Sequence, residues 1–477
     1  MYLALDLGTS GLKALLVDSD QSIVAEVTAL LTVTRPHPGW SEQSPADWIA
    51  ACEQVLDALA RSHGEALSAV RAIGLSGQMH GATLLGEGDE VLRPCILWND
   101  TRSHEQAATL DADPRFREIS GNIVFPGFTA PKLAWVRDYE PDLFARTTRV
   151  LLPKDYLRLW LSGDTMSDMS DAAGTGWLDG GTRAWSADLL AATHLDESHM
   201  PVLVEGSEPA GKLRQSLAKR WGMKDCIVAG GAGDNAASAI GLGAVSSGEG
   251  FVSLGTSAVL FAATDSYAPN PQSAVHAFCH AVPATWHQMG VFLSATDSLN
   301  WWAKVSSADV PTLVAEAEAS PTEDGPIFLP YLAGERTPHN DASVRGAFFD
   351  LDHNHDRAAM TNAVLAGVAF ALRDSLDALA QAGTRLESVL AVGGGTRSSH
   401  WLQIIADALQ LPVELPASGE LGAAFGAARL AMMADGAALD GIATRPKIAR
   451  LFEPQSHKSK QLARYRALYP ALKEASR

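Results

Sequence analysis

Asp234 is the carboxylate whose surroundings most favour chemistry. It follows an apolar, strand-like run at residues 225–229 and stands among glycines in residues 230–236. A carboxylate at the carboxyl end of a strand lies where open α/β sheets bind their ligands. There it could accept the proton of an attacking hydroxyl, as phosphoryl transfer to an alcohol requires. Asp234 and Asn235 could instead cap the following helix, so their position alone leaves both interpretations open.

The tetrapeptide Leu-Gly-Thr-Ser occurs at residues 7–10 and again at 254–257, each time between strand-like runs. Backbone N–H groups and hydroxyls of two such turns could hold phosphates from two sides. Asp6, at the first turn, could engage Mg²⁺ directly or through water. The glycines at 393–395 could let a nucleotide approach the backbone closely. Each feature alone is most simply a turn, and only their combination favours phosphoryl transfer.

Two other nucleotide-binding patterns nearly match and are rejected. Residues 206–212 have P-loop spacing up to Lys212, but Leu213 stands where a hydroxyl must meet Mg²⁺, so we expect a surface loop. Residues 231–236 fit the dinucleotide pattern G-x-G-x-x-A. That site would place Asp234 against a pyrophosphate, which is an unfavourable contact of like charges.

Cysteine and histidine positions predict neither disulfides nor a metal site. The four cysteines lie far apart in the chain, which fits a reducing, cytoplasmic location. His276 and His280 have the i, i+4 spacing of a metal-binding pair and flank Cys279, but the sequence offers no second cysteine pair to complete a zinc site. We interpret residues 276–280 as a strand or the wall of a cleft.

The elements that must position these groups alternate between strands and helices, which predicts an α/β protein. Residues 2–18 indicate a β-hairpin whose tip is the first turn. Residues 45–60 and 363–382 have the apolar periodicity of packed helices, and residues 422–431 suit a closely packed small-residue helix. A strand at 388–392 leads into the three glycines. Because the Leu-Gly-Thr-Ser turn repeats after 247 residues, we expect two similar halves divided near residue 245, with a ligand cleft between them.

Composition limits the classes of partner. Hydrophobic residues make up 47% of the 477 residues and charged residues 19%, which is typical of a folded globular protein. The formal net charge of −18 disfavours nucleic acid and anionic membrane surfaces as partners. The N-terminus lacks a basic signal-peptide region, and the sequence contains no run of about 18 apolar residues that could span a membrane.

The whole pattern resembles the FGGY family of carbohydrate kinases. It implies two actin/Hsp70-like (ribonuclease H-like) α/β domains, residues 1–244 and 245–477, with ATP and sugar in the cleft between them. The first domain would bind the sugar and carry the base, and the second would mainly bind the nucleotide. Besides the segments described above, the resemblance rests on residues 77–81, 96–100, 127–133, 152–156, 167–175 and 334–338.

The resemblance also implies roles for individual residues. Asp234 would take the proton of the sugar hydroxyl, and Asp6 would associate with Mg²⁺. Met79, His80 and Asn235 would contact the sugar together with Asp234. Ser399 stands where the family often has an Asn that contacts the nucleotide. The other residues expected to bind ATP are Thr9, Ser10, Gly255, Thr256, Gly394 and Gly395.

Residue types around the predicted base indicate a substrate with several hydroxyls. Met79 can face a carbon skeleton, whereas His80 and Asn235 can donate and accept hydrogen bonds. The resemblance implies D-xylulose as acceptor and D-xylulose 5-phosphate as product. Ribulose, gluconate or an alditol are alternatives, since gluconate kinases share the Met-His pair. An ATPase or a sugar-binding module that transfers no phosphoryl group is the alternative from another class of protein. A homodimer is the assembly that we expect to test.

Overall fold

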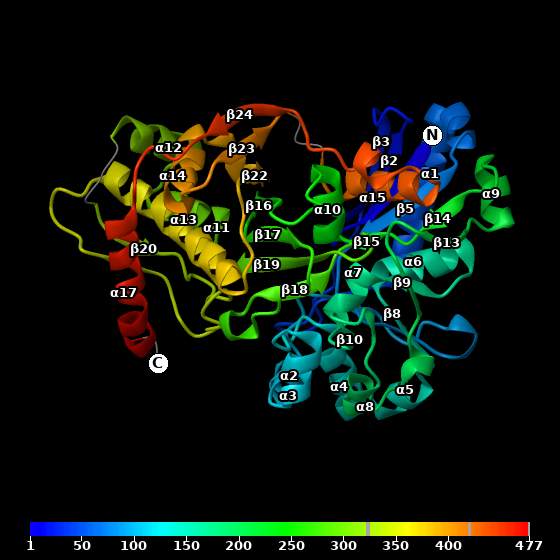
Figure 1. Cartoon of the computed structure of the whole chain (residues 1–477). Coiled ribbons are helices and arrows are strands. Elements are labelled where there is room, and N and C mark those ends of the chain that lie inside the picture. The colour runs from blue at the N-terminus through cyan, green and yellow to red at the C-terminus, as the bar shows by residue number, and fades with distance from the viewer. Residues whose placement is uncertain (321–324, 418–420, 476–477) are drawn as a thin grey trace.

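The computed structural model describes residues 1–320, 325–417 and 421–475, and each half of the chain forms a seven-stranded sheet. Figure 1 shows the two sheets side by side, with helix α10 (Asp234–Leu242) between them. This arrangement of sheets with helices confirms the α/β prediction. None of the helices in the described ranges is both long and apolar enough to cross a membrane.

The first sheet is centred on β1 (Tyr2–Leu7). It pairs antiparallel with β2 (Gly11–Val17), which confirms the predicted hairpin, and parallel with β5 (Ala72–Gly77). Parallel pairing brings the carboxyl ends of β1 and β5 to one edge of the sheet. The complete order is β13 (Pro209–Lys212), β14 (Ile227–Ala229), β5, β1, β2 and β3 (Ile23–Leu30), with β15 (Ala232–Gly233) beside β5.

The second sheet repeats the construction of the first. β16 (Gly250–Leu254) pairs antiparallel with β17 (Ala258–Thr264) and parallel with β22 (Val389–Val392), as β1 does with β2 and β5. The repeated Leu-Gly-Thr-Ser turn therefore joins equivalent strands in the two halves. The complete order is β18 (His276–Cys279), β19 (Trp286–Phe292), β17, β16, β22, β23 (Val413–Pro416) and β24 (Ile448–Phe452).

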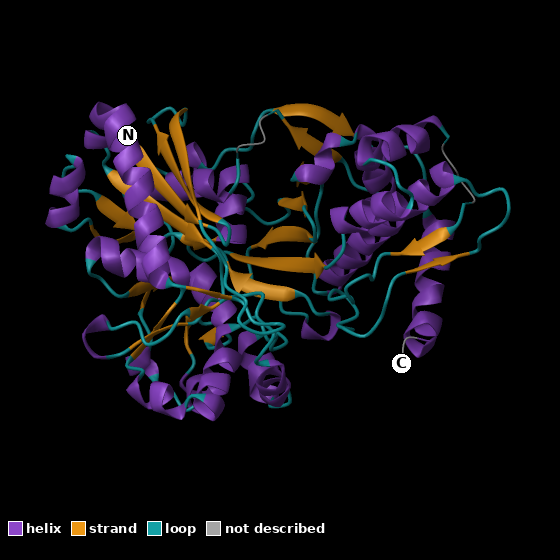
Figure 2. Cartoon of the chain, turned by 180° about the vertical axis from the view of Figure 1, so that it is seen from behind, coloured by secondary structure: helices purple, strands orange, loops and turns teal. Residues whose placement is uncertain are grey.

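Helices cover both sheets, and Figure 2 shows them on the outer sides and below the first sheet. The helices of the first half are α1 (Pro45–Ser68), α2 (His104–Asp111), α3 (Pro114–Ser120), α4 (Thr129–Tyr139), α5 (Pro141–Arg146), α6 (Pro153–Ser162), α7 (Met169–Ala172), α8 (Ala187–Ala192), α9 (Gln215–Trp221) and α10. Those of the second are α11 (Thr296–Val305), α12 (Val310–Ala319), α13 (Arg357–Gln381), α14 (Ser399–Leu409), α15 (Ala423–Ala434), α16 (Leu439–Ile442) and α17 (Ser459–Ala475).

Short strand pairs complete the fold outside the two large sheets. They are β4 (Glu42–Gln43) with β7 (Cys95–Ile96), β6 (Thr83–Leu85) with β8 (Arg149–Leu151), β9 (Met166–Asp168) with β12 (Val202–Val204), β10 (Leu178–Asp179) with β11 (Ala184–Trp185), and β20 (Ile327–Leu329) with β21 (Ala347–Phe349).

Side chains of β1 point alternately to the two faces of the sheet, each of which packs against different helices. Leu3 and Leu5 belong to the core formed with α1 and α6, whereas Tyr2 and Ala4 belong to the core formed with α15. Each fully buried leucine contributes about 1.5–3 kcal/mol. Asp6 has the same parity as Tyr2 and Ala4, and therefore lies on the face that α15 covers.

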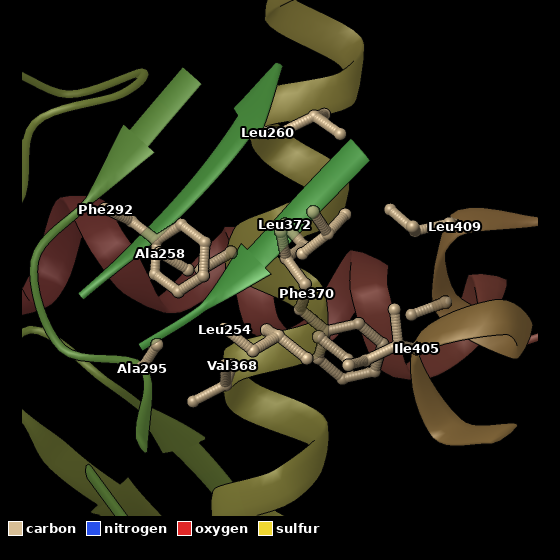
Figure 3. Close-up of a cluster of buried hydrophobic side chains, with 14 of the residues drawn as sticks. Leu254, Ala258, Leu260, Phe292, Ala295, Val368, Phe370, Leu372, Ile405 and Leu409 are labelled. Atoms are coloured by element: carbon tan, nitrogen blue, oxygen red, sulfur yellow. The ribbon is translucent and has the colours of Figure 1, made fainter. Parts of the chain in front are cut away.

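The core of the second half lies between its sheet and helices α13 and α14, where apolar side chains from all three meet (Figure 3). Predicted periodicity at 363–382 is confirmed, and α13 begins earlier, at Arg357, because the Asp356 side chain accepts a hydrogen bond from the backbone N–H of Ala359 at 2.9 Å. The labelled members of this core are Leu254, Ala258, Leu260, Phe292, Ala295, Val368, Phe370, Leu372, Ile405 and Leu409.

Two elements differ from the prediction. The helix expected at residues 45–60 continues to Ser68, through a non-helical backbone position at His63. The segment 206–212 was expected to be a surface loop, but its last four residues form strand β13, which pairs antiparallel with β14 at the edge of the first sheet. The residues of β13 have little strand-forming tendency of their own, so the sequence did not predict a strand here. They form one because a strand at the edge of a sheet needs a partner on one side only.

Helix α15 lies between β23 and β24 of the second sheet in the chain but packs on the first sheet. Its small residues approach the backbone of its neighbours closely, as the composition of residues 422–431 predicts. A Cβ at Gly74 of β5 would lie 1.8 Å from the carbonyl oxygen of Ala427, and a Cβ at Gly426 would lie 1.8 Å from that of Ala237 in α10. Helix α15 therefore holds α10 against the sheet.

We expect Gly426→Ala to destabilise the protein, because the new methyl group meets backbone that cannot yield without moving α10. Overpacking of this kind costs about 1–3 kcal/mol in the free energy of unfolding, measured in urea. Gly441→Ala in α16 is the matched control, since nothing lies within 4 Å of its Cβ position. Equal stability of the two variants would contradict the close packing of α15 on α10.

Candidate active site

A cavity of about 250 Å³ lies where the two halves meet. Four of the residues predicted to bind or activate a sugar line it, all from the first half. Strands of the second half supply the opposite wall. The lining residues are Met79, His80, Trp98, Asp234, Asn235, Ser257, Val259, His276, Phe278, Met289, Val291 and Arg336.

Strand pairing places Asp234 beside the Met-His segment. Strand β15 pairs with the end of β5, at Ser76 and Gly77, so α10 begins next to residues 78–80. Burial and the nearby charge of Asp6 raise the pKa of Asp234 to about 6, although Asn235 donates two hydrogen bonds to its Oδ1, at 2.7 and 3.0 Å. A carboxylate with this pKa is ionised at neutral pH and is a stronger base than an ordinary aspartate.

His80 is fixed in one tautomer. Its Nδ1 lies 2.6 Å from the carbonyl oxygen of Gly174, so Nδ1 carries the proton and Nε2 is left as an acceptor. Burial and the neighbouring cation Lys132 lower the pKa of His80 to about 3, so the ring is neutral. The ring stacks on Phe128 at 4.9 Å, and Lys132 donates to the His80 carbonyl oxygen at 2.8 Å. These contacts hold an uncharged acceptor at the cavity.

Two further residues of the cavity, Trp98 and Arg336, were not predicted individually from their residue types. Trp98 lies in the segment 96–100, and Arg336 lies in the segment 334–338, both of which entered only as parts of the family resemblance. The interpretation of residues 276–280 as a strand or the wall of a cleft is confirmed, because β18 spans His276–Cys279 and His276 lines the cavity, whereas His280 lies outside both. Composition could not single out Trp98 or Arg336, because their chemistry depends on contacts with residues far away in the chain.

A second cavity, of about 490 Å³, contains the predicted adenosine-side glycines. Gly394 faces open space, since nothing lies within 4 Å of its Cβ position. Ser398 lines the cavity but Ser399 does not, and the Ser399 hydroxyl accepts a hydrogen bond from Arg450 at 2.8 Å. The lining residues are Thr296, Leu299, Asn300, Val310, Pro311, Val314, Gly394, Gly395, Arg397, Ser398 and Trp401.

The turn at residues 254–257 lines the smaller cavity and is hydrogen-bonded to a residue that lines the larger one. Thr296, which lines the larger cavity, donates from its backbone N–H and its hydroxyl to the carbonyl oxygen of Gly255, at 3.0 and 2.8 Å. The backbone N–H of Ala295 donates to the carbonyl oxygen of Thr256, and Ser257 lines the smaller cavity. A group held by this turn would therefore lie between the two cavities.

The turn at residues 7–10 is hydrogen-bonded to Gln78, which directly precedes the Met-His pair. Thr9 donates from its hydroxyl to Gln78 at 2.8 Å and accepts from the indole of Trp98 at 3.0 Å, so its hydroxyl is already engaged. Ser10 is exposed. Asp6 accepts a hydrogen bond from Ser76 at 2.8 Å, and burial raises the pKa of its carboxyl.

A buried ion network contacts strand β15, which directly precedes the base. The ammonium of Lys154 lies 2.5 Å from Asp155, 2.7 Å from Asp168 and 3.3 Å from Asp171, and all four side chains are fully buried. The three carboxylates have the grouping of a metal site, but the lysine ammonium occupies their centre. Asp168 accepts from the hydroxyl of Ser170 at 2.5 Å, and this hydroxyl accepts from the backbone N–H of Gly233 at 3.2 Å, directly before Asp234.

Family models match both halves of the chain. The N-terminal domain of the FGGY family of carbohydrate kinases matches residues 1–241, and its C-terminal domain matches residues 250–434. The xylulose kinase of Escherichia coli strain K12 is 48% identical over 437 residues, which cover 91% of this chain and 90% of that protein. The xylulose kinase of Bacillus subtilis strain 168 is 36% identical over 441 residues, covering 91% and 88%.

Solved structures are similar over the whole chain. A xyloylose kinase from Brucella ovis has a TM-score of 0.98 and 60% identity, covering 99% of both chains. A xylulose kinase from Rhodospirillum rubrum has a TM-score of 0.92 and 30% identity, also covering 99% of both chains. These similarities confirm the predicted fold class of actin/Hsp70-like domains.

We expect Asp234→Asn to stabilise the protein at high pH only. The folded pKa of about 6 exceeds the ordinary 3.8, so the folded state binds this proton more tightly and loses stability as pH rises from about 4 to 6. Removing the charge should raise the free energy of unfolding at pH 8 by on the order of 1–3 kcal/mol and leave it unchanged near pH 4. Urea unfolding at both pH values measures this.

Asp356→Asn is the control for that comparison, because Asp356 also begins a helix but is exposed and lies outside the cavity. It should change stability little at either pH. A stabilisation by Asp234→Asn that is equal at pH 4 and pH 8 would show that the buried charge of Asp234 is not its cause.

Proposed function

The chain belongs to the FGGY family of carbohydrate kinases, and from this membership and the geometry of the cavity we propose that it transfers the γ-phosphoryl group of ATP to D-xylulose, giving ADP and D-xylulose 5-phosphate. Its 48% identity to xylulose kinases over 91% of the chain supports this choice of sugar. The observation that carries the proposal is Asp234, a base of raised pKa in a cavity that is also lined by Ser257. The turn that contains Ser257 is hydrogen-bonded to Thr296, which lines the second, larger cavity.

In the proposed reaction, the carboxylate of Asp234 takes the proton of the sugar hydroxyl O5. The O5 electron pair forms a bond to the γ-phosphorus, and the bond from that phosphorus to the β,γ-bridging oxygen breaks, leaving its electron pair on ADP. His80 Nε2 and the Asn235 side chain would fix the other hydroxyls, and Met79 would contact the carbon skeleton. Positioning of this kind supplies much of the rate enhancement in phosphoryl transfer.

The larger cavity would hold adenosine, with Gly394 and Gly395 against the nucleotide. The backbone of the turns at residues 8–10 and 255–257 would hold the phosphates, since the Thr9 hydroxyl is engaged within the protein. Ser398 is better placed than Ser399 for a nucleotide contact, because it lines the cavity.

We also propose Asp6 as the residue that holds Mg²⁺, through water or directly. Asp6 raises the pKa of Asp234, so a cation beside it would relieve repulsion between the two carboxylates. Mg²⁺ commonly keeps several waters and binds one or two carboxylates with substrate phosphates, and the carboxylate of Asp6 can serve as one such ligand. When bound, the ion neutralises charge on the phosphate oxygens.

The division into domains at residues 1–244 and 245–477 is part of the proposal, with the sugar and the base on the first domain and the nucleotide mainly on the second. Closure of the two halves around both substrates would exclude water and suppress hydrolysis of ATP. A cytoplasmic location is supported by the four cysteines, which are free and buried.

Measuring ADP release across D-xylulose, D-ribulose, gluconate, glycerol and alditols tests the proposed function. We expect the highest kcat/KM with D-xylulose and a loss of roughly 10² or more in kcat for Asp234→Asn, with nucleotide binding retained. Asp356→Asn should keep wild-type turnover. ADP release that is independent of any added sugar would instead indicate an ATPase, and near-normal turnover of Asp234→Asn would refute the role of the base.

A substitution at Gly394 tests the nucleotide cavity. Because a side chain there would project into open space within the cavity, we expect Gly394→Leu to raise KM for ATP roughly tenfold or more, equivalent to about 1.4 kcal/mol, while KM for the sugar stays the same. Gly422→Leu is the control, since its Cβ position is also open but lies outside that cavity. Unchanged KM for ATP in Gly394→Leu would place the nucleotide elsewhere.

A further inference from the structure

The chemistry of the proposed substrate sets a requirement on the cavity. D-Xylulose can close a five-membered ring only by joining O5 to the C2 carbonyl, so transfer to O5 requires the open-chain ketone. Its C2 oxygen then accepts hydrogen bonds but cannot donate them, whereas each hydroxyl can do both. A site that selects a 2-ketose must therefore present a donor to this oxygen.

Most polar groups of the cavity cannot be that dedicated donor. Asp234 is an acceptor when ionised, and His80 presents Nε2 as an acceptor because Nδ1 donates to Gly174. The indole N–H of Trp98 donates to Thr9. Asn235 already donates from its amide to Asp234. Ser257 and His276 also line the cavity, but each can accept as well as donate, and His276 accepts from Arg336 through Nε2. Arg336 has five N–H groups and no acceptor, so it is the lining group best suited to an oxygen that only accepts.

Hydrogen bonds within the second half hold the backbone of Arg336 in place. The backbone N–H of Thr337 donates to the carbonyl oxygen of Val291 in β19, and the Thr337 hydroxyl accepts from the backbone N–H of Val291. Glu335 accepts from the backbone N–H of Arg336 at 2.7 Å and from that of Leu293 at 3.2 Å. These hydrogen bonds fix the segment 335–337 beside β19, and Met289 and Val291 of that strand line the same cavity.

The guanidinium itself lies between an aromatic ring and a neutral imidazole. Its carbon lies 4.5 Å from the centre of the Phe125 ring, and one N–H donates to Nε2 of His276 at 3.4 Å. Among the described residues, none of the ion pairs involves this guanidinium. Burial raises the pKa of the adjacent Glu335 to about 8, so that side chain does not supply a full compensating charge at neutral pH.

We propose that Arg336 determines specificity by donating hydrogen bonds to the C2 carbonyl oxygen of the open-chain ketose. This inference rests on the proposed function. Hydrogen bonds donated by a charged guanidinium are strong. A group that only donates cannot accept the proton that an alditol hydroxyl carries at C2, whereas a carbonyl oxygen carries no proton. The sugar then bridges the two halves, with O5 at Asp234 of the first and the carbonyl at Arg336 of the second.

The test compares D-xylulose with xylitol and D-arabinitol, which carry a hydroxyl in place of the carbonyl. For Arg336→Met we expect kcat/KM with D-xylulose to fall on the order of 10²-fold and kcat/KM with the alditols to fall by less than about fivefold, so that the preference for the ketose collapses. Arg336→Lys, which keeps the charge but loses the fork of donors, should give an intermediate preference. Arg345→Met is the control, because Arg345 is exposed in the same loop and lies outside the cavity.

Each outcome is decisive. Equal losses with ketose and alditols in Arg336→Met, or an unchanged ratio, would overturn the proposal and assign Arg336 a general structural role. If Arg336→Met does not fold, the ratio measured for Arg336→Lys decides in the same way. A wild-type preference for D-xylonate over D-xylulose would assign the guanidinium to a carboxylate and overturn both proposals. A wild-type enzyme that phosphorylates D-xylulose while the variants keep the ketose preference refutes the inference alone.

Discussion

Parallel pairing of β5 with β1 on one side and with β15 on the other determines where the chemistry of the first half lies. Asp6 is opposite Ser76 in one pairing, and Gly77 is opposite Gly233 in the other. Because all three strands end at the same edge, one backbone hydrogen-bond pattern brings Asp6, the Met-His segment and Asp234 together. A shift of one residue in β15 would turn its side chains to the other face of the sheet.

A network of buried charges stabilises the register of β15 beside β5. A fully buried cation among three carboxylates is expensive to desolvate, and a hydrophobic cluster could be equally stable. The arrangement also orients polar atoms, since the chain from Lys154 through Asp168 and Ser170 reaches the backbone N–H of Gly233. Arg158 adds hydrogen bonds to the carbonyl oxygens of Ala229 and Gly230. We infer that the network maintains the geometry of the strand end more than it adds stability.

The sequence was informative wherever function depends on local patterns. Asp234, Met79 and His80 belong to short segments with turn chemistry, and the structure brings them to one cavity. Arg336 and Trp98 could not be chosen by residue type, since each meets the cavity only through tertiary contacts. The serine near the nucleotide shows another limit of prediction from sequence. Ser398 lines the cavity and Ser399 does not, because α14 begins at Ser399 and the helix start sets the directions of the two side chains. Similarly, the small residues at 422–431 predicted a close-packed helix but not that it would cover the sheet of the other half.

The packing of α15 from the second half onto the sheet of the first half has a consequence for the synthesis of the protein. The face of the first sheet that carries Tyr2 and Ala4 is completed by α15, which ends at Ala434. Until this helix has left the ribosome, the apolar face made by the earliest residues has no permanent cover, and α10 lacks the helix that holds it. The N-terminal half therefore cannot finish folding as an independent unit during translation, and the two halves must mature together.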